Sequence, residues 1–322
     1  MVLDWCAMEA SRFTSCDTLC EQFNFVDWIW DVCVVDEQCS QLAIGTAHNS
    51  VVIWSLRENK AIRYHYGKER CILYSLSFLN LHGKLLVASG TVFMQVHIWS
   101  ITNPAHTLVC KAHKGVIFKL RWSADGRYLL SVSDDRALIA WRNSISSTPW
   151  SSLEATTVES LLAGSYEPCI HAFGHTARLW DCLFTDDCLI TTSEDCTVRF
   201  WDAAGQCQAV MGGHKGKHVW CIAYHPSTML AISGGNDGSV KLWDVQGILT
   251  TARSASTKTL TIPSMRNETG NGDEKAKMAP RTSKSECIRD LLVTADGTEV
   301  IVASNWGYLW KYDLNRDVWE DL

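Results

Sequence analysis

The chain has little proline and no long hydrophobic run. Six prolines among 322 residues, with 47% hydrophobic residues, is the composition of an ordinary globular protein. No apolar stretch approaches the roughly 18 residues that a membrane-spanning helix requires. The first ten residues, MVLDWCAMEA, contain Asp4 and lack the basic start and apolar stretch of a signal peptide. We therefore expect a cytoplasmic protein that does not bind membranes.

An excess of positive charge is also absent. The formal net charge is −6 and the isoelectric point is about 6.0. This balance argues against non-specific binding of nucleic acid by the whole surface, although it is compatible with a local basic patch.

The 14 cysteines predict neither disulfides nor a metal site. Cys16 and Cys20 form an isolated pair without the second pair that a zinc site needs, so we predict no metal. Others lie in or beside strand-like stretches, where a reduced thiol packs as a small hydrophobic group in a reducing compartment. These are Cys182, Cys188, Cys196, Cys207 and Cys221.

One module occurs twice, end to end, between residues 174 and 245. Each copy opens with Gly-His, passes through two β-patterned stretches and a turn with Asp, and closes on Trp-Asp. His175 precedes Trp201 by 26 residues, and His214 precedes Trp243 by 29. Such a unit, recurring about every 40–45 residues, is typical of a WD-repeat blade, one sheet of a β-propeller.

Six repeats are recognisable. Residues 112–142, 174–202 and 213–245 are clear copies, and 28–54, 70–99 and 287–314 are weaker ones, the last with Tyr312 at the closing position. Alternating apolar residues predict strands, and Asp125-Gly126 and Asp296-Gly297 predict turns that tolerate a left-handed backbone. We predict an all-β WD-repeat propeller over residues 26–322; whether six repeats close a ring stays open. Residues 1–25 are expected to be a divergent segment or an outer strand.

The closing aromatic residues reveal two insertions. They are spaced by 45, 42, 60, 42 and 69 residues, so two intervals are stretched. The first excess predicts an inserted, Ser/Thr-rich loop near 143–170. The second predicts a loop near 249–286, which has seven Lys and Arg against four Asp and Glu and lacks apolar periodicity. We expect this second loop to be mobile.

The most specific constellation is a His–Ser/Thr–Asp–Trp set that recurs in the three clear repeats. The Asp stands six residues before the closing Trp and the hydroxyl stands ten before it. A buried imidazole needs partners for both nitrogens, and the hydroxyl and the carboxylate supply them. We predict three such structural networks: His113, Ser131, Asp135 and Trp141; His175, Thr191, Asp195 and Trp201; His214, Ser233, Asp237 and Trp243.

The same residue types invite a catalytic interpretation, which we consider much weaker. The sets recur once per blade, and each hydroxyl lies inside a strand rather than on an exposed turn. The stretch GGHKGKH (212–218) is one residue short of a phosphate-binding loop and has His218 where a hydroxyl is needed. We therefore predict no enzymatic activity and no cofactor.

Four lysines lie in two equivalent loops: Lys111 and Lys114 in one, Lys215 and Lys217 in the other. Because such loops share one face of a propeller, these lysines could jointly contact RNA phosphates or a partner. An ordinary solvated surface is the alternative.

Eight segments, in their order along the chain, resemble the N-terminal propeller of the WD-repeat protein six family. The resemblance extends from about residue 26 to residue 322. The segments are DWIWDV (27–32), AHNSVVIW (47–54), SGTVFMQVHIW (89–99), HKGVIF (113–118), FGHTARLWDC (173–182), SEDCTVRFW (193–201), GGNDGSVKLW (234–243) and YDLNRDVWEDL (312–322).

That family contains the non-catalytic partner of a tRNA 2′-O-ribose methyltransferase that acts at the wobble position. The resemblance implies a platform that orients tRNA, with the methyltransferase catalytic subunit and tRNA as partners. Family members are longer, so we expect a short isoform, a truncated gene model or a fragment. A general scaffold for protein complexes is the alternative. Its ubiquitin-ligase form is disfavoured, because Ala204 and Gln246 stand where such receptors usually carry Arg.

Overall fold

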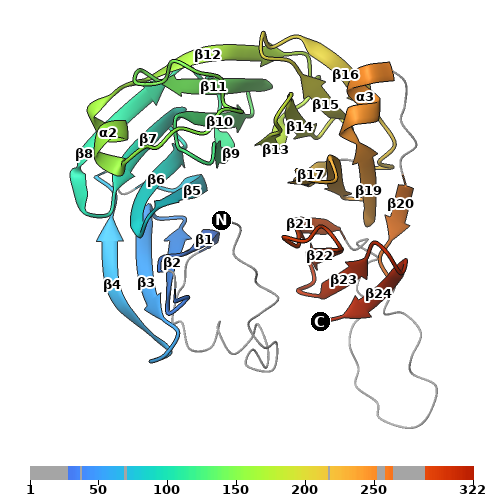
Figure 1. Cartoon of the computed structure of the whole chain (residues 1–322), viewed down its shortest axis with the longest axis horizontal. Coiled ribbons are helices and arrows are strands. Elements are labelled where there is room, and N and C mark those ends of the chain that lie inside the picture. Colours follow the sequence, from blue (N-terminus) through green and yellow to red (C-terminus); the bar gives the residue numbers. More distant parts are fainter. Residues whose placement is uncertain (1–27, 37, 69–70, 217, 252–257, 264–286) are drawn as a thin grey trace.

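Six four-stranded antiparallel sheets follow one another around a central axis (Figure 1). The computed structural model describes residues 28–36, 38–68, 71–216, 218–251, 258–263 and 287–322. In each sheet every strand pairs with the next one in sequence, from the innermost strand to the outermost. The predicted all-β propeller fold is confirmed.

The sheets are numbered as blades 1 to 6 in chain order. Blades 1 to 3 are β1 (Ile29–Val34), β2 (Gln41–Thr46), β3 (Ser50–Ser55) and β4 (Lys60–Tyr66); β5 (Leu73–Leu81), β6 (Lys84–Thr91), β7 (Gln95–Ser100) and β8 (Asn103–Lys111); β9 (Ile117–Trp122), β10 (Tyr128–Ser133), β11 (Ala137–Asn143) and β12 (Tyr166–Phe173). Blades 4 to 6 are β13 (Leu179–Phe184), β14 (Leu189–Ser193), β15 (Val198–Trp201) and β16 (Cys207–Met211); β17 (Val219–His225), β18 (Leu230–Gly235), β19 (Ser239–Asp244) and β20 (Lys258–Thr261); β21 (Ile288–Val293), β22 (Glu299–Ser304), β23 (Leu309–Asp313) and β24 (Val318–Asp321).

The third strand of each blade carries the closing aromatic residue. Trp201 lies opposite Leu189 and Trp243 lies opposite Ala231 in the strand pairing. Tyr312 lies opposite Val300 in the same way, so it occupies the closing position of blade 6. The predicted Asp-Gly turns also form, with positive φ at Gly126 and Gly297.

The hydrophobic core lies between the blades. Alternating apolar side chains on each sheet pack against the neighbouring sheet, and each consecutive pair of blades shares one cluster of buried residues. A further cluster, around Trp54 and Val52, belongs to blade 1 alone. Innermost strands pack in series from β1 to β21, and within the described residues no comparable packing joins blade 6 back to blade 1. The six blades therefore form an open arc (Figure 1).

Aspartates on two innermost strands bond forward to the next blade. Asp31 Oδ2 accepts from the backbone N–H of Phe78 at 2.9 Å, which links blade 1 to blade 2. Asp181 Oδ2 accepts from the N–H of Ile222 at 3.1 Å, which links blade 4 to blade 5. Asp290 holds the equivalent place in blade 6, where its Oδ1 accepts from its own neighbour Leu291. The bonds of Asp31 and Asp181 join neighbouring sheets, and each gives a partner to a backbone amide at the boundary between two blades.

A β-bulge marks the second residue of every innermost strand. In each blade the strand pairing skips this residue, as between Leu179 and Asp181 in β13. The same irregularity occurs in the other five blades. A bulge turns one side chain out of the regular pattern of the sheet, and here it does so at one level around the axis. The bulged residues are Trp30, Tyr74, Phe118, Trp180, Trp220 and Arg289.

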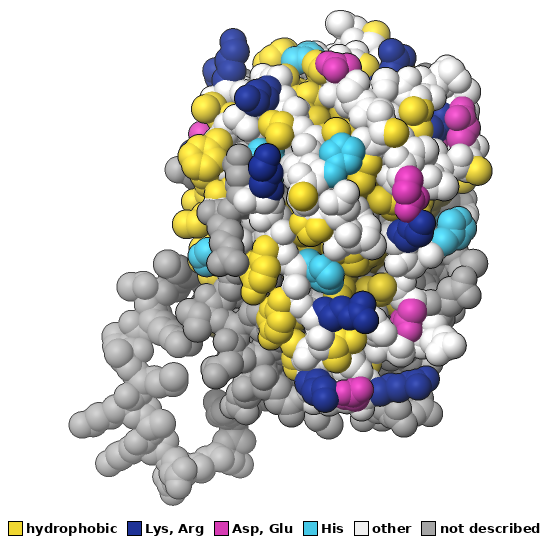
Figure 2. Space-filling view, turned by 90° about the vertical axis from the view of Figure 1, so that its left-hand side faces the viewer, with side chains coloured by type: hydrophobic (Ala, Val, Ile, Leu, Met, Phe, Trp, Pro, Cys, Tyr) yellow, Lys and Arg dark blue, Asp and Glu magenta, His cyan; other side chains and the backbone are white. Residues whose placement is uncertain are grey.

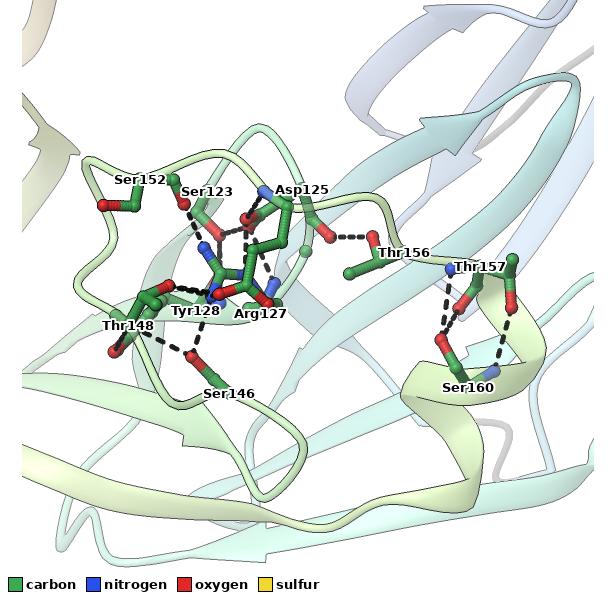
Figure 3. Close-up of polar contacts among 12 residues, drawn as sticks. Ser123, Asp125, Arg127, Tyr128, Ser146, Thr148, Ser152, Thr156, Thr157 and Ser160 are labelled. Atoms are coloured by element: carbon green, nitrogen blue, oxygen red, sulfur yellow. Dashed lines mark hydrogen bonds and ion pairs between the residues drawn. The ribbon is translucent and has the colours of Figure 1, made fainter.

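The insertion near 143–170 is ordered by a buried arginine (Figure 3). The Arg127 side chain is 1% exposed; its Nε pairs with Asp125 Oδ2 at 2.5 Å and its Nη1 with Glu154 Oε1 at 2.8 Å. Nη1 also donates to Ser146 Oγ at 3.2 Å, and Nη2 donates to the backbone oxygen of Ser152. The guanidinium thus connects the inserted loop to the β9–β10 turn. A buried charge requires close partners of opposite charge, and here the loop and the turn supply them.

The rest of this insertion is not a loop. A short helix, α2 (Val158–Ala163), follows, and β12 begins at Tyr166. Thr157 and Ser160 form a capping box at the start of the helix (Figure 3). Leu161 is buried in the cluster between blades 2 and 3. The helix depends on this burial, because six residues are too few to hold a helix in water.

The second predicted insertion also contains regular structure. Helix α3 (Val245–Thr251) follows β19, and β20 completes blade 5 within a segment that was expected to be loop. Residues 252–257 and 264–286, on which the expected mobility depends, lie outside the described residues, as do residues 1–25. None of the helices in the described part of the chain is long and apolar enough to cross a membrane.

Candidate functional site

The three predicted His–Ser/Thr–Asp–Trp networks form, one in each of blades 3, 4 and 5. In blade 4, His175 Nδ1 lies 2.8 Å from Asp195 Oδ2, and its Nε2 lies 2.8 Å from Thr191 Oγ1. The indole Nε1 of Trp201 donates to the same hydroxyl at 2.8 Å. Each network joins the loop before the innermost strand to the second and third strands of its blade.

The other two networks repeat this geometry within a few tenths of an ångström. In blade 3 the distances are 2.9 Å for His113–Asp135, 2.7 Å for His113–Ser131 and 2.8 Å for Trp141–Ser131. In blade 5 they are 3.0 Å for His214–Asp237, 2.8 Å for His214–Ser233 and 2.8 Å for Trp243–Ser233.

Burial separates these networks from catalytic triads. The hydroxyls of Ser131, Thr191 and Ser233 belong to residues that are 0% exposed, in the middle of the second strand. Each also accepts a hydrogen bond from a tryptophan, so it is not poised to attack a substrate. A nucleophile must reach the reacting carbon, and these cannot.

The networks shift the pKa values of their own members. Burial raises the pKa of Asp135, but hydrogen bonds from His113 and from backbone N–H groups outweigh it and lower the pKa to about 2. The same balance lowers the pKa values of Asp195 and Asp237. Burial lowers the pKa of His175, and its bond to Asp195 opposes this only in part. The carboxylates are therefore held ionised, as groups that accept several N–H bonds are.

Blade 2 builds a related network with a residue that the sequence analysis missed. Trp99 Nε1 donates to Ser89 Oγ at 3.2 Å, and Ser89 Oγ donates to Asn49 Oδ1 at 2.8 Å. Asn49 belongs to the β2–β3 turn of blade 1, and its φ is +54°. Asn49 therefore occupies the position that the histidine has in the other networks, but it comes from the neighbouring blade. A turn asparagine in AHNS was the available signal, since Asn tolerates this backbone conformation.

Cations from three consecutive blades lie on the face that carries the histidine loops. Lys114 and Lys215 are exposed, and their backbone N–H groups donate to Asp135 and Asp237. Blade 4 lies between them, and its equivalent loop supplies Arg178, which the sequence analysis did not single out. Lys111 is exposed at the end of β8, and Lys217 lies outside the described residues. Lys114 and Lys215 are thus on one face, but they are separated by blade 4.

The outer side of blades 1 and 2 carries charges of both signs. Figure 2 shows the side over β4 and β8, where Lys and Arg are interspersed with Asp, Glu, His and hydrophobic groups. Mixed charges of this kind are ordinary for a solvated surface.

The five aromatic bulged residues, together with Trp28, form a continuous track of rings around the axis, which we call the aromatic rim. The track begins with Trp28, just before β1, which contacts Trp30 of the same blade, and each later contact joins the rings of two consecutive blades as far as Trp220. The centroid distances are 5.8 Å for Trp28–Trp30, 6.5 Å for Trp30–Tyr74, 5.8 Å for Tyr74–Phe118, 4.7 Å for Phe118–Trp180 and 4.4 Å for Trp180–Trp220.

Cationic groups extend the aromatic rim. The guanidinium of Arg289 lies 4.1 Å from the Trp220 ring centroid, and that of Arg178 lies 5.8 Å from the Trp180 ring centroid. His218 stacks on Trp220 at 4.6 Å and accepts a hydrogen bond from Trp180 Nε1 at 3.1 Å. Stacking of this type keeps planar groups in fixed orientations.

Comparison with known proteins agrees with this geometry. The model of the WD domain, G-beta repeat, matches residues 103–142, 167–202 and 205–244. These segments contain the closing Trp residues of the three networks. The chain is a WD-repeat β-propeller.

The propeller also resembles one group of longer proteins. It is 25% identical over 311 residues to the tRNA (34-2′-O)-methyltransferase regulator WDR6 of Bos taurus, and 25% identical over 315 residues to that of Homo sapiens. Each match covers 93% of this chain and 24% of the relative. The chain thus spans about a quarter of the length of these curated relatives. Periodic tryptophan protein 2 of Arabidopsis thaliana is 24% identical over 317 residues, which is 88% of this chain and 34% of that protein.

Proposed function

We propose that this propeller is a non-catalytic scaffold that partners a tRNA 2′-O-ribose methyltransferase and helps to position tRNA for modification at the wobble nucleotide. The observation that carries the proposal is the match to the WDR6 regulators over 93% of the chain. The match extends over nearly the whole propeller rather than over one repeat.

The geometry supports a binding role rather than a catalytic one. The His, Asp and hydroxyl groups of blades 3, 4 and 5 bond to each other and hold loops in place. In the proposed division of labour the methyltransferase supplies the S-adenosylmethionine site, and the propeller orients the tRNA. Holding the tRNA in the right orientation can lower the activation barrier of methyl transfer by several kcal/mol, on the order of what is found when two reactants are held in place.

We also propose a cytoplasmic location. Cys182, Cys188 and Cys221 are buried thiols in the cores between blades. Burial raises the pKa of Cys188 to about 11, which keeps the thiol protonated and unreactive. Such cysteines suit a reducing compartment such as the cytoplasm. In this proposal the wobble nucleotide of tRNA is modified there.

Co-expression with the catalytic subunit of the methyltransferase tests the proposal. The tagged chain is expected to retain the subunit on an affinity column and to raise the fraction of tRNA that carries a 2′-O-methyl group at position 34. A full-length WDR6 relative is the positive control, and the methyltransferase alone is the baseline. Unchanged methylation together with no co-purification would refute the proposal.

A general scaffold for protein complexes is the second candidate. The match to periodic tryptophan protein 2, at 24% identity over 88% of the chain, favours it, because the chain is about as similar in sequence to a protein of another name. Affinity capture from lysate distinguishes the two: the first candidate expects the methyltransferase, and the second expects other proteins without it.

A further inference from the structure

We propose that the aromatic rim binds single-stranded RNA, with unpaired bases stacked on its rings and phosphates held by Arg289 and by the cations of the neighbouring loops. The choice of RNA over DNA rests on the proposed function. The site itself rests on the bulges, the ring contacts and the cations.

The bulges place one kind of side chain at one level of the propeller. At the second position of the innermost strand, five blades present an aromatic ring and blade 6 presents Arg289. Flanking positions are different: the first residue is apolar in every blade, and it is 0% exposed in blades 2 to 6, whereas Ile29 of blade 1 is 50% exposed. In blades 2 to 6 the first residue therefore supplies core packing, whereas the bulged residues lie at the edge of the core: Trp30 and Trp220 pack against it in part, and Tyr74 is exposed. Bulges next to binding sites re-aim side chains in this way.

The rings are partly accessible. Tyr74 is 38% exposed and Trp28 is 69% exposed, while Phe118, Trp180 and Trp220 are half-buried. Consecutive centroids lie 4.4–6.5 Å apart, so the rings are supported by each other and present their remaining surface without a rearrangement. Fixed rings lose little conformational entropy when a base stacks on them.

Arg289 is the strongest candidate for a phosphate contact. It is exposed, it lies over the Trp220 ring, and no carboxylate of the described residues forms an ion pair with it. Arg178, in contrast, is paired with Asp134 Oδ1 at 3.2 Å and Glu194 Oε2 at 3.0 Å, so much of its charge is compensated. Lys114 and Lys215 are exposed in the loops that lead into β9 and β17. Phosphates are therefore expected beside blades 3, 5 and 6.

Unpaired bases fit this surface better than a duplex or a peptide does. A duplex keeps its bases stacked inside, and its bases cannot reach aromatic rings, whereas single strands are recognised by stacking on aromatic and guanidinium planes. A peptide would use backbone donors and acceptors, but the aromatic rim presents ring surface and planar guanidinium groups. Anticodon loops carry unpaired bases, which is consistent with the proposed function.

Fluorescence anisotropy tests the site directly. The probe is a labelled single-stranded RNA of mixed sequence, about ten nucleotides long, which is within the range that one such surface holds. The full chain is expected to bind it more tightly than the same sequence in a duplex. Tyr74→Ala is expected to weaken binding about tenfold, the usual loss for one stacked base. Arg289→Ala is expected to weaken binding by a similar factor through the loss of a phosphate contact, and to make the affinity less dependent on salt. Tyr74→Phe should retain the parent affinity, since it keeps the ring.

Matched variants on the outer side provide the control. Tyr64→Ala and Arg63→Ala replace an exposed tyrosine and arginine of β4, and both should bind RNA as the parent does. Thermal melting verifies that each variant is folded. RNA affinity that is unchanged by Tyr74→Ala and Arg289→Ala would overturn the proposal, and so would equal binding of the duplex. Peptide binding that depends on these residues, without RNA binding, would assign the aromatic rim to a peptide instead.

One further measurement separates a failure of the RNA site from a failure of the proposed function. Co-purification of the methyltransferase is measured for the parent and for Arg289→Ala. If the methyltransferase is retained but RNA affinity does not depend on the rim, only the RNA site is wrong. If the rim binds RNA but no methyltransferase is retained, the RNA site stands and the proposed partner is wrong.

Discussion

The carboxylate of Asp181 in blade 4 accepts a hydrogen bond from the backbone N–H of Ile222 in blade 5, at 3.1 Å. Its residue is 1% exposed, and Arg121 Nη2 lies 3.2 Å from the same oxygen. One side chain therefore connects three innermost strands, β9, β13 and β17.

Asp181→Ala is expected to lower the free energy of unfolding by about 2–3 kcal/mol, because a buried amide loses a charged acceptor. Urea unfolding followed by tryptophan fluorescence measures this. Asp290→Ala is the matched control, since it changes the same position in blade 6, where the residue is exposed. Its effect should stay below about 0.5 kcal/mol, as for most surface substitutions. Equal losses in the two variants would contradict the bridging role.

Thr191→Val tests the network of blade 4. The substitution preserves shape but leaves His175 Nε2 and Trp201 Nε1 without their shared partner. We expect a loss of about 2–3 kcal/mol, the cost of buried groups that are left unsatisfied. The neighbouring Thr192 is an internal control, because its buried hydroxyl has no hydrogen-bond partner among the described residues. Thr192→Val should be neutral or stabilising in the same unfolding experiment.

Most of this network geometry could be predicted from sequence, because the closing Trp, the hydroxyl and the Asp recur at fixed offsets of ten and six residues. The Asp-Gly turns could be predicted for a similar local reason. Helix α2 and strand β20 could not, since α2 depends on burial of Leu161 between two blades and β20 depends on pairing with β19. The aromatic rim was missed because its residues matter only as a set. Reading five or six residues beyond each His would have revealed Phe118, Trp180 and Trp220.

The pH dependence of stability should contain a contribution from His175. Its pKa is lowered in the folded state, from an ordinary value of 6.5, because burial disfavours the charged imidazole. As the pH falls through 6.5, the histidine is therefore protonated in the unfolded chain before it is protonated in the folded one. The free energy of unfolding decreases in this pH range. We expect the free energy of unfolding to fall between pH 7.5 and 5.5, and to fall less in His175→Gln. The contribution should persist in His106→Gln, whose side chain is exposed on β8. An identical slope in the parent and in His175→Gln would contradict this account.

Arg127→Met should loosen the first insertion. The change removes a buried cation and leaves Asp125 and Glu154 with one partner fewer, at a cost of about 3 kcal/mol. Proteolysis and hydrogen exchange of residues 144–156 should accelerate more than those of the blades. Arg142→Met, on the exposed side of β11 next to the insertion, is the control and should leave this segment protected. Equal acceleration by both variants would show that Arg127 does not hold the loop.

The open arc has a consequence for cooperativity. Each blade in the middle is held by two neighbours, whereas within the described residues blades 1 and 6 each pack on one neighbour. The array is therefore energetically close to one-dimensional, with stability that adds up from blade to blade and is lowest at its two ends. Local unfolding of blade 6 would spread to blade 5 only if the cluster that the two blades share is also lost. The three networks of blades 3, 4 and 5 therefore lie in the part of the molecule that unfolds last.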